Sequence, residues 1–204
     1  VPMVFLNRVV PGHPSVIMDG AGGMRQTIDH LAALGHRHIA YLNGPRDSWS
    51  NRERAKGLRR AERHRIKVSR FGPFAPRFES GLQAADLVLA SGATAVIAYN
   101  DVMALGVLAR LAERGVPVPG RISVAGFDNI TFAAMATPAL TTVDLGGERA
   151  GRAAVDTLLA VLADRDADAP RQVLDSALIV RASTGPAPDA GPDAAGPGGP
   201  QGEP

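Results

Sequence analysis

The chain has 204 residues, of which 45% are hydrophobic, and its 22 Lys and Arg against 20 Asp and Glu give a formal net charge of +2. No apolar run approaches the roughly 18 residues needed to span a bilayer, and cysteine is absent. These features exclude a membrane span, a disulfide scaffold and thiolate chemistry, and they favour a globular protein of a reducing, cytoplasmic compartment.

Strand-like and helix-like patterns alternate through the first half of the chain. Gly35 is placed to close the first helix as a C-terminal cap, and Gly44-Pro45 marks a turn. The basic run at 52–65 is interpreted as a solvated helix face, because no aromatic platform accompanies it. The patterns predict strands at 2–6, 15–18, 38–42 and 68–71 and helices at 22–34, 50–64 and 79–90.

The same rhythm continues in the second half, with strands predicted at 95–99, 122–125, 141–144 and 177–181 and helices at 102–113 and 148–163. Asp101 is the expected N-cap of the helix that follows it. Such alternation indicates an α/β fold with parallel sheets flanked by helices. Residues 185–204 lack any apolar period, which predicts a disordered tail.

Polar side chains follow two neighbouring predicted strands where each strand ends. Asn100 and Asp101 come after one apolar run, and Asp128 and Asn129 come after another. Because open α/β sheets bind ligands at the carboxyl ends of parallel strands, the pattern predicts a site for a small polar molecule. The alternative for these side chains is capping of the next helix.

Several motifs together, in this order and spacing, resemble those of sugar-responsive bacterial repressors of the LacI/GalR type. Each motif is weak alone, and the match covers about residues 1–184. The motifs are Asp19 to Gly23, Leu34-Gly35-His36-Arg37-His38, Arg54-x-x-Gly57, Tyr99-Asn100-Asp101-x-Met103-Ala104-x-Gly106, Ile122-Ser123-Val124-x-Gly126-Phe127-Asp128 and Pro138-Ala139-Leu140-Thr141-Thr142-Val143.

The resemblance implies a two-lobe, type I periplasmic-binding-protein-like fold with the ligand between the lobes. Carried onto this chain, 1–42 plus 144–170 would form a partial N-terminal lobe, and 43–143 plus 171–184 the C-terminal lobe. The family's helix-turn-helix is missing from this sequence, as are two further βα units, so we expect an incomplete N-terminal lobe. Operator DNA would be bound only through that missing segment.

The resemblance also implies which side chains hold a sugar-like effector. Arg54, Asn100 and Asp128 match the family's regular polar contacts, Ser50 and Asn7 match positions that vary with the effector, and Phe74 is the expected stacking aromatic, with Phe78 as its rival. Trp49 is expected at the rim of the cleft, as a stacking or a packing residue.

The segment 102–109 carries no polar side chain, which is more than one helix face packed on a sheet requires. One interpretation is a deeply buried helix. The other is a homodimer interface around Leu105, joined by Phe132 and Met135, since repressors of this type resemble two-fold dimers.

The histidines, the glycines at 20–23 and the acidic residues form no recognisable metal, nucleotide or catalytic motif. The histidines show no metal-binding spacing, and the glycines at 20–23 lack the remainder of a nucleotide-binding fingerprint. No nucleophile motif is present, so no catalytic residue, metal or cofactor is expected. The sequence therefore predicts the ligand-sensing, dimerising region of a transcriptional regulator. A solute-binding protein of a sugar transporter is the alternative, and a sugar-modifying enzyme is a more distant one.

Overall fold

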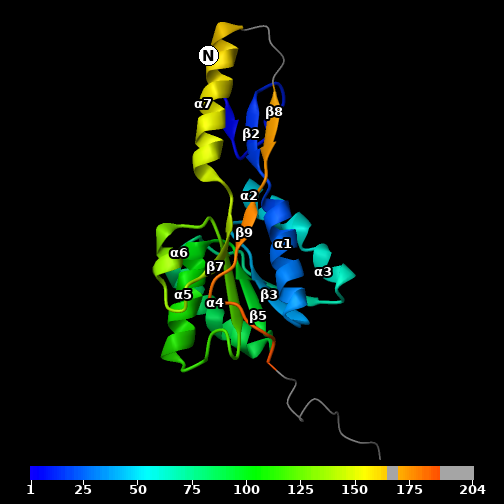
Figure 1. Cartoon of the computed structure of the whole chain (residues 1–204), viewed down its shortest axis with the longest axis vertical. Coiled ribbons are helices and arrows are strands. Elements are labelled where there is room, and N and C mark those ends of the chain that lie inside the picture. The colour runs from blue at the N-terminus through cyan, green and yellow to red at the C-terminus, as the bar shows by residue number, and fades with distance from the viewer. Residues whose placement is uncertain (165–169, 189–204) are drawn as a thin grey trace, which may run out of the picture.

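The computed structural model describes residues 1–164 and 170–188. Its larger part is built on a six-stranded sheet of order β4-β3-β5-β6-β7-β9, parallel except for the antiparallel β9 (Figure 1). The strands are β3 (His38–Leu42), β4 (Lys67–Phe71), β5 (Ala95–Ala98), β6 (Ser123–Phe127), β7 (Thr141–Asp144) and β9 (Ala177–Ile179).

Helices cover both faces of this sheet, and the central strands are therefore apolar on both sides. In β3, Ile39 and Tyr41 join one buried cluster, whereas Ala40 and Leu42 join the other. A parallel sheet covered on two faces accounts for such continuous apolar runs. The helices are α1 (Gly20–Ala33), α2 (Trp49–Gly57) and α3 (Arg60–Arg63) on one face, and α4 (Phe78–Ala90), α5 (Asp101–Glu113) and α6 (Thr131–Met135) on the other.

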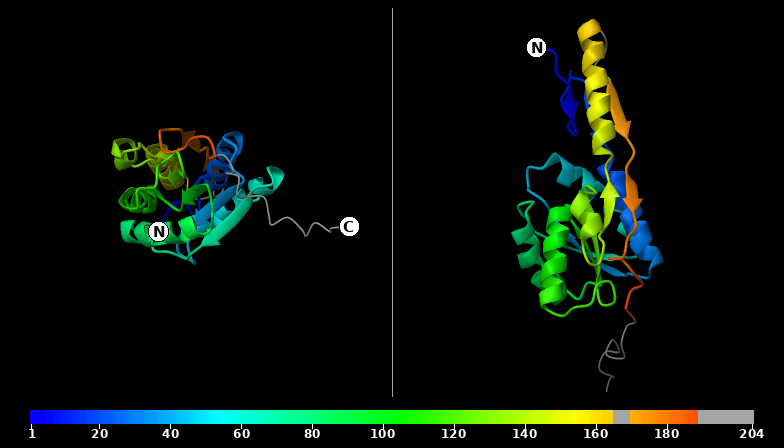
Figure 2. Two further views of the ribbon diagram at one scale, coloured as in Figure 1. Left: turned by 90° about the horizontal axis from the view of Figure 1, so that it is seen from below. Right: turned by 60° about the vertical axis from the view of Figure 1, so that its left-hand side comes forward.

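A smaller lobe extends from one end of this body. Its sheet has the order β1-β2-β8, from β1 (Phe5–Leu6), β2 (Ser15–Met18) and β8 (Arg171–Leu174), all parallel. Helix α7 (Gly147–Ala163) packs along β1 and β2 and rises with them away from the larger lobe (Figure 2). Its outward face leaves Val155, Leu159 and Leu162 exposed.

Three segments join the lobes: β2 into α1, β7 into α7, and β8 into β9. They are tied together where they cross, since the Asp19 amide donates to the Leu174 carbonyl at 2.9 Å and the Ser176 hydroxyl donates to the Asp19 carbonyl at 2.8 Å. The expected periplasmic-binding-protein-like architecture is confirmed. None of the helices in the described ranges is long and apolar enough to cross a bilayer.

The lobes divide differently from the predicted boundaries. Strand β3 pairs with β4 and β5, and α1 packs Met24, Ile28 and Leu31 into the larger core, so the segment from 20 to 42 belongs with the larger lobe. Strand β8 pairs with β2 and belongs to the smaller lobe. The chain changes lobes after β2, and the boundary at residue 42 was wrong because it passed over this first crossing.

Two local predictions also need correction. The helix predicted at 50–64 is two helices, α2 and α3, separated at Leu58 and Arg59. The tail does not begin at Gly185: this residue is buried, its carbonyl accepts a hydrogen bond from the Ser123 hydroxyl at 3.2 Å, and the Ala187 amide donates to Leu34. The remainder of the predicted tail, 189–204, lies outside the described residues.

Candidate functional site: a charged pair at the junction of the lobes

Arg54 lies at the carboxyl edge of the larger sheet and is almost fully buried. Its guanidinium carbon lies 4.6 Å from the centre of the Tyr99 ring and 4.5 Å from that of Phe127. Nη1 donates to the Tyr99 carbonyl, and Nη2 donates to Asp128 Oδ1 at 2.9 Å. Two rings and two acceptors therefore fix the guanidinium in one orientation.

The helix that carries Arg54 is anchored at its first turn. Ser48 is the N-cap of α2 and accepts from the Asn51 amide at 3.1 Å, and its hydroxyl also lies 3.0 Å from the Tyr99 hydroxyl. The Asn51 side chain accepts from Tyr41 and from the Gly44 amide, both at 3.0 Å. Because α2 is tied to the ends of β3 and β5, its position follows that of the sheet.

Asp128 follows β6 in a backbone conformation that L-residues seldom adopt, with φ of +104°. Burial raises the pKa of its carboxyl group, and the Arg54 guanidinium opposes that rise. About 39% of the side chain remains accessible. Arg54 and Asp128 thus form an oriented pair of opposite charges with one accessible member.

The Nε of Arg54 is buried and has no hydrogen-bond partner, the one such side-chain atom in the described part of the chain. A buried donor without a partner costs free energy, so this atom is a candidate ligand contact. Arg54 lines a cavity of about 10 Å³ between the lobes, with Met18 and Asn7 on one side and α2 on the other. The residues around it are Asn7, Met18, Gly20, Trp49, Ser50, Glu53, Arg54 and Leu145.

Asn7 and Ser50 meet across this junction, where Asn7 Nδ2 donates to the Ser50 hydroxyl at 2.9 Å. Asn7 follows β1 of the smaller lobe, and Ser50 lies in α2 of the larger lobe. A cavity of about 10 Å³ holds at most about one water molecule, so it is too small for a sugar as it stands.

The other predicted effector contacts lie differently. Asn100 is the N-cap of α5: its Oδ1 accepts from the Met103 amide at 3.0 Å, and its Nδ2 is available as a donor to an effector. Neither Asn100 nor Asp128 lines the small cavity, although Arg54 joins their two strand ends through Tyr99 and Asp128. The predicted cap, Asp101, is instead a fully buried first residue of the helix.

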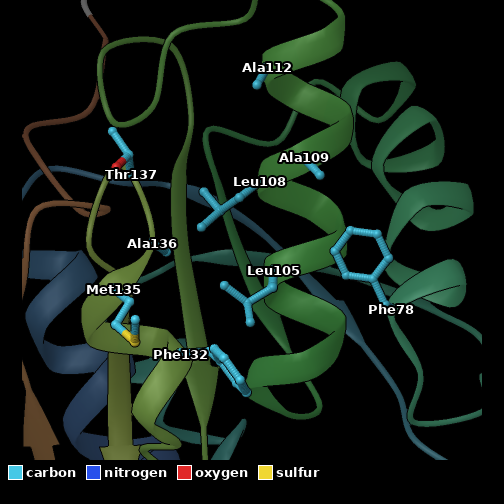
Figure 3. A pocket seen from close by; sticks show the side chains of 9 residues that line it. All are labelled: Phe78, Leu105, Leu108, Ala109, Ala112, Phe132, Met135, Ala136 and Thr137. Carbon is cyan, nitrogen blue, oxygen red and sulfur yellow. The ribbon is translucent and has the colours of Figure 1, made fainter.

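Phe74 does not line the cavity; it packs on the core beneath α4 and α5. Phe78, its rival, points into an apolar surface groove elsewhere on the larger lobe (Figure 3). The roles of Tyr99 and Phe127 were not predicted from the sequence, although these residues immediately precede Asn100 and Asp128. An aromatic at the end of a strand is the signal that could have identified them.

The groove in Figure 3 has a volume of about 380 Å³ and lies between α4, α5 and α6. Phe132 and Met135 are 64% and 71% exposed, and Leu105 lies between them and Phe78. The three predicted interface residues therefore share one apolar surface. Its lining is Phe78, Leu105, Leu108, Ala109, Ala112, Phe132, Met135, Ala136 and Thr137.

The histidines have structural surroundings. His36 is buried with its ring nitrogens 2.9 Å from the Thr94 hydroxyl and 3.1 Å from the Ser123 hydroxyl, and its burial lowers the pKa of the imidazole. His30 lies 2.9 Å from the Thr184 hydroxyl. Within 1–164 and 170–188 there is no group of His, Asp or Glu that could hold a metal ion.

This arrangement, with two α/β lobes, three crossing segments and an oriented charge pair at their junction, defines a ligand-binding domain of the periplasmic-binding-protein type. A family model described as a periplasmic binding protein-like domain matches residues 28–184. The chain belongs to the LacI family of transcriptional regulators.

Individual relatives agree. The chain is 34% identical over 202 residues to the transcriptional regulator DegA of Bacillus subtilis, a match that covers 91% of this chain and 57% of DegA. A LacI family regulator from Enterococcus faecium with bound ribose superposes with a TM-score of 0.84 at 27% identity, covering 91% of this chain and 71% of the other.

A complex of the regulator CelR with cellobiose superposes with a TM-score of 0.81 at 33% identity, covering 90% of this chain and 59% of the other. The chain spans about half the length of the curated relatives that it matches. Those relatives are named as regulators of transcription, which favours this class over the solute-binding protein and the enzyme considered above.

Proposed function

We propose that this chain is the effector-sensing region of its regulator and takes a sugar-like molecule between the two lobes. The observation that carries the proposal is the buried Arg54 guanidinium, held against Asp128 with its Nε unpartnered at the junction. Two structural relatives contain sugars, ribose in one and cellobiose in the other.

The chemistry of the pair suits a polyol. Adjacent hydroxyls donate to a carboxylate and accept from a guanidinium, so one diol satisfies Asp128 and Arg54 together, with Asn100 Nδ2 as a further donor. Hydrogen bonds to charged groups contribute about 1.5–3 kcal/mol each, and an analogue lacking a hydroxyl leaves a buried donor such as Arg54 Nε unpaired. Such a site would therefore select ligands by the pattern of their hydroxyls.

Entry of a ligand requires the lobes to move apart. Small-molecule sites generally enclose about 300–1,000 Å³, far more than the cavity at the junction. The Asn7–Ser50 hydrogen bond bridges the lobes where they would separate. We infer that this contact exchanges with a ligand hydroxyl when the site fills.

The experiment is a thermal-shift screen of the 204-residue chain with ribose, cellobiose and a panel of other pentoses, hexoses and disaccharides. A binding sugar at 100 times its Kd adds roughly 2.7 kcal/mol of stability. We expect Arg54→Lys and Asp128→Asn to abolish the shift, whereas Arg63→Lys, an exposed residue of α3, leaves it unchanged. A shift that survives in Arg54→Lys and Asp128→Asn contradicts the assigned site.

We also propose that the groove around Leu105, Phe132 and Met135 is a homodimer interface. The support is its apolar lining and the high exposure of Phe132 and Met135, since exposed patches of this kind mark interaction sites. Sedimentation velocity should show a dimer that Phe132→Asp converts to a monomer without loss of helical circular dichroism. A monomeric wild-type chain at high micromolar concentration contradicts the proposal.

In the whole regulator, operator DNA would be contacted by a helix-turn-helix outside these 204 residues, as the names of the relatives imply. Dimerisation would then match the two-fold symmetry of an operator. A protein acting on operator DNA works in the cytoplasm of a bacterium. Effector and operator would be coupled reciprocally, so the sugar affinity of the full-length regulator should change when operator DNA is bound.

A further inference from the structure

Asp101 is the one fully buried carboxylate of the described residues, and the proposed effector chemistry does not use it. It is the first residue of α5, directly after the Asn100 cap. Its Oδ1 accepts from the Thr142 hydroxyl at 2.5 Å, and its Oδ2 accepts from the Ile130 amide at 2.9 Å. The carboxylate therefore links three elements: α5, β7 and the start of α6.

The space for this carboxylate depends on Gly126 of β6. A Cβ at Gly126 would lie 2.2 Å from Asp101 Oδ1, closer than any side chain tolerates. Burial raises the pKa of Asp101 to about 6, which means that its charge is held at a cost near neutral pH. The carboxylate of Asp101 thus occupies space that any side chain at residue 126 would fill.

The segment that Asp101 holds, Asp128 to Ile130, has an unusual backbone. Asp128 and Asn129 have φ of +104° and +50°, in the left-handed region that non-glycine residues avoid. Three successive amides are fixed: Asp128 to the Val143 carbonyl at 2.9 Å, Asn129 to the Thr142 hydroxyl at 3.3 Å, and Ile130 to Asp101. Strained backbone persists only where surrounding contacts determine it. Of the three hydrogen bonds that fix these amides, Asp101 accepts one directly, from Ile130, and supports a second through Thr142.

Each residue of the segment points to a different part of the molecule. Asp128 pairs with Arg54 at the junction of the lobes. Asn129 donates to Asp144 at 3.4 Å, at the crossing into α7, and accepts from Arg181 at 2.8 Å. Ile130 is the N-cap position of α6, the helix that presents Phe132 and Met135.

From this geometry we infer that Asp101 is a positioning residue, whose carboxylate holds residues 128–130 so that the effector-facing Asp128 and the first turn of α6 keep one arrangement. The inference deepens the proposed function and rests on it for the word effector. The fixed segment itself stands on the hydrogen bonds given above. The positioning role predicts that a substitution at Asp101 alters the surroundings of the Arg54 side chain, although Asp101 does not contact Arg54.

The test compares four variants of the 204-residue chain by hydrogen–deuterium exchange resolved at single amides, together with the NMR signal of the Arg54 Nε–H group. Asp101→Ala removes both acceptors. Asp101→Asn keeps an acceptor for the Ile130 amide and can donate to Thr142. Thr142→Val removes only the bridging hydroxyl. Ser123→Ala is the control: Ser123 is equally buried and hydrogen-bonded, but at the opposite end of β6.

We expect Asp101→Ala to accelerate exchange of the Asn129 and Ile130 amides about tenfold relative to the amides of β5, and to shift the Arg54 signal. Asp101→Asn should restore slow exchange at Ile130. Ser123→Ala should lower stability without a selective effect at 129–130. Uniform acceleration throughout the chain in Asp101→Ala, or the same selective effect in Ser123→Ala, would overturn the inference.

If Asp101→Ala does not fold, the same two measurements on Thr142→Val test the inference. It should accelerate exchange at Asn129 and move the Arg54 signal, and no change at either place overturns the inference. The exchange and NMR measurements use no sugar, so selective exchange in a chain that binds no sugar in the thermal-shift screen refutes the proposed function alone. A sugar bound with wild-type affinity by folded Asp101→Ala refutes the positioning role alone.

Discussion

The buried carboxylate of Asp101 makes the stability of this chain depend on pH in a direction opposite to that of an ion-paired acid. Its pKa of about 6 in the folded chain exceeds the ordinary value of 3.8 because burial disfavours the charged form. Between these values the folded state holds a proton that the unfolded state has released. The stabilising contribution is therefore complete below about pH 4 and is lost as the pH rises through about 6.

The size of the effect follows from the shift. At about 1.4 kcal/mol per pKa unit, a rise from 3.8 to about 6 corresponds to about 3 kcal/mol of unfolding free energy. Asp101→Asn removes the titrating group while conserving shape. Relative to this variant, the wild-type chain should lose about 3 kcal/mol between about pH 4 and about pH 7.5.

The assay is urea unfolding of both chains at half-unit pH steps, followed by circular dichroism. The difference between the two curves is the useful quantity, because His36 and His30, whose pKa values are lowered by burial, contribute equally to both. A difference that is flat with pH, or that grows in favour of the wild type as the pH rises, would refute the reasoning. Either result would mean that Asp101 is charged at little cost.

Two further predictions concern close packing around the candidate site. Gly126→Ala should lower the free energy of unfolding by about 1–3 kcal/mol because its Cβ meets the Asp101 carboxylate. Gly151→Ala, in the open interior of α7, should raise it by about 0.5–1 kcal/mol. Equal effects of the two substitutions in urea unfolding would contradict the steric argument. Gly44→Ala places a Cβ 2.4 Å from the Tyr99 ring. We therefore expect the free energy of unfolding to fall by about 1–3 kcal/mol and the NMR signal of Arg54 Nε–H to shift. An unchanged signal would show that Tyr99 does not hold the guanidinium.

Much of the secondary structure was predictable because its causes are local. The runs at 38–42, 95–98 and 141–144 are short, apolar and bounded by turn residues, and they form β3, β5 and β7. Glycine at residue 115 ends α5 with φ of +65°, as a C-terminal cap should. The motifs also indicated the family, since their order along the chain survives without any knowledge of contacts.

One error falls where two residues were equally suited to one role. Asn100 and Asp101 are both good N-cap residues, and the structure assigns the cap to Asn100. The choice depends on the space beside Gly126 and on donors from Ile130 and Thr142, which lie 29 and 41 residues from Asp101 in sequence. The sequence around Asn100 and Asp101 contains no pattern that indicates the space left by Gly126 on a neighbouring strand.

The burial of Gly185 was also not predictable from local sequence. A glycine among prolines has no side chain that would indicate burial, yet its backbone is hydrogen-bonded to Ser123. By itself the sequence determined the alternation of strands and helices, the polar character of the strand ends and the family. Only the tertiary structure decided which segments share a lobe and that Arg54 lies between two rings beside Asp128. Those facts depend on the pairing of strands and the packing of side chains distant in sequence, whose free energy exists only when the whole chain is folded.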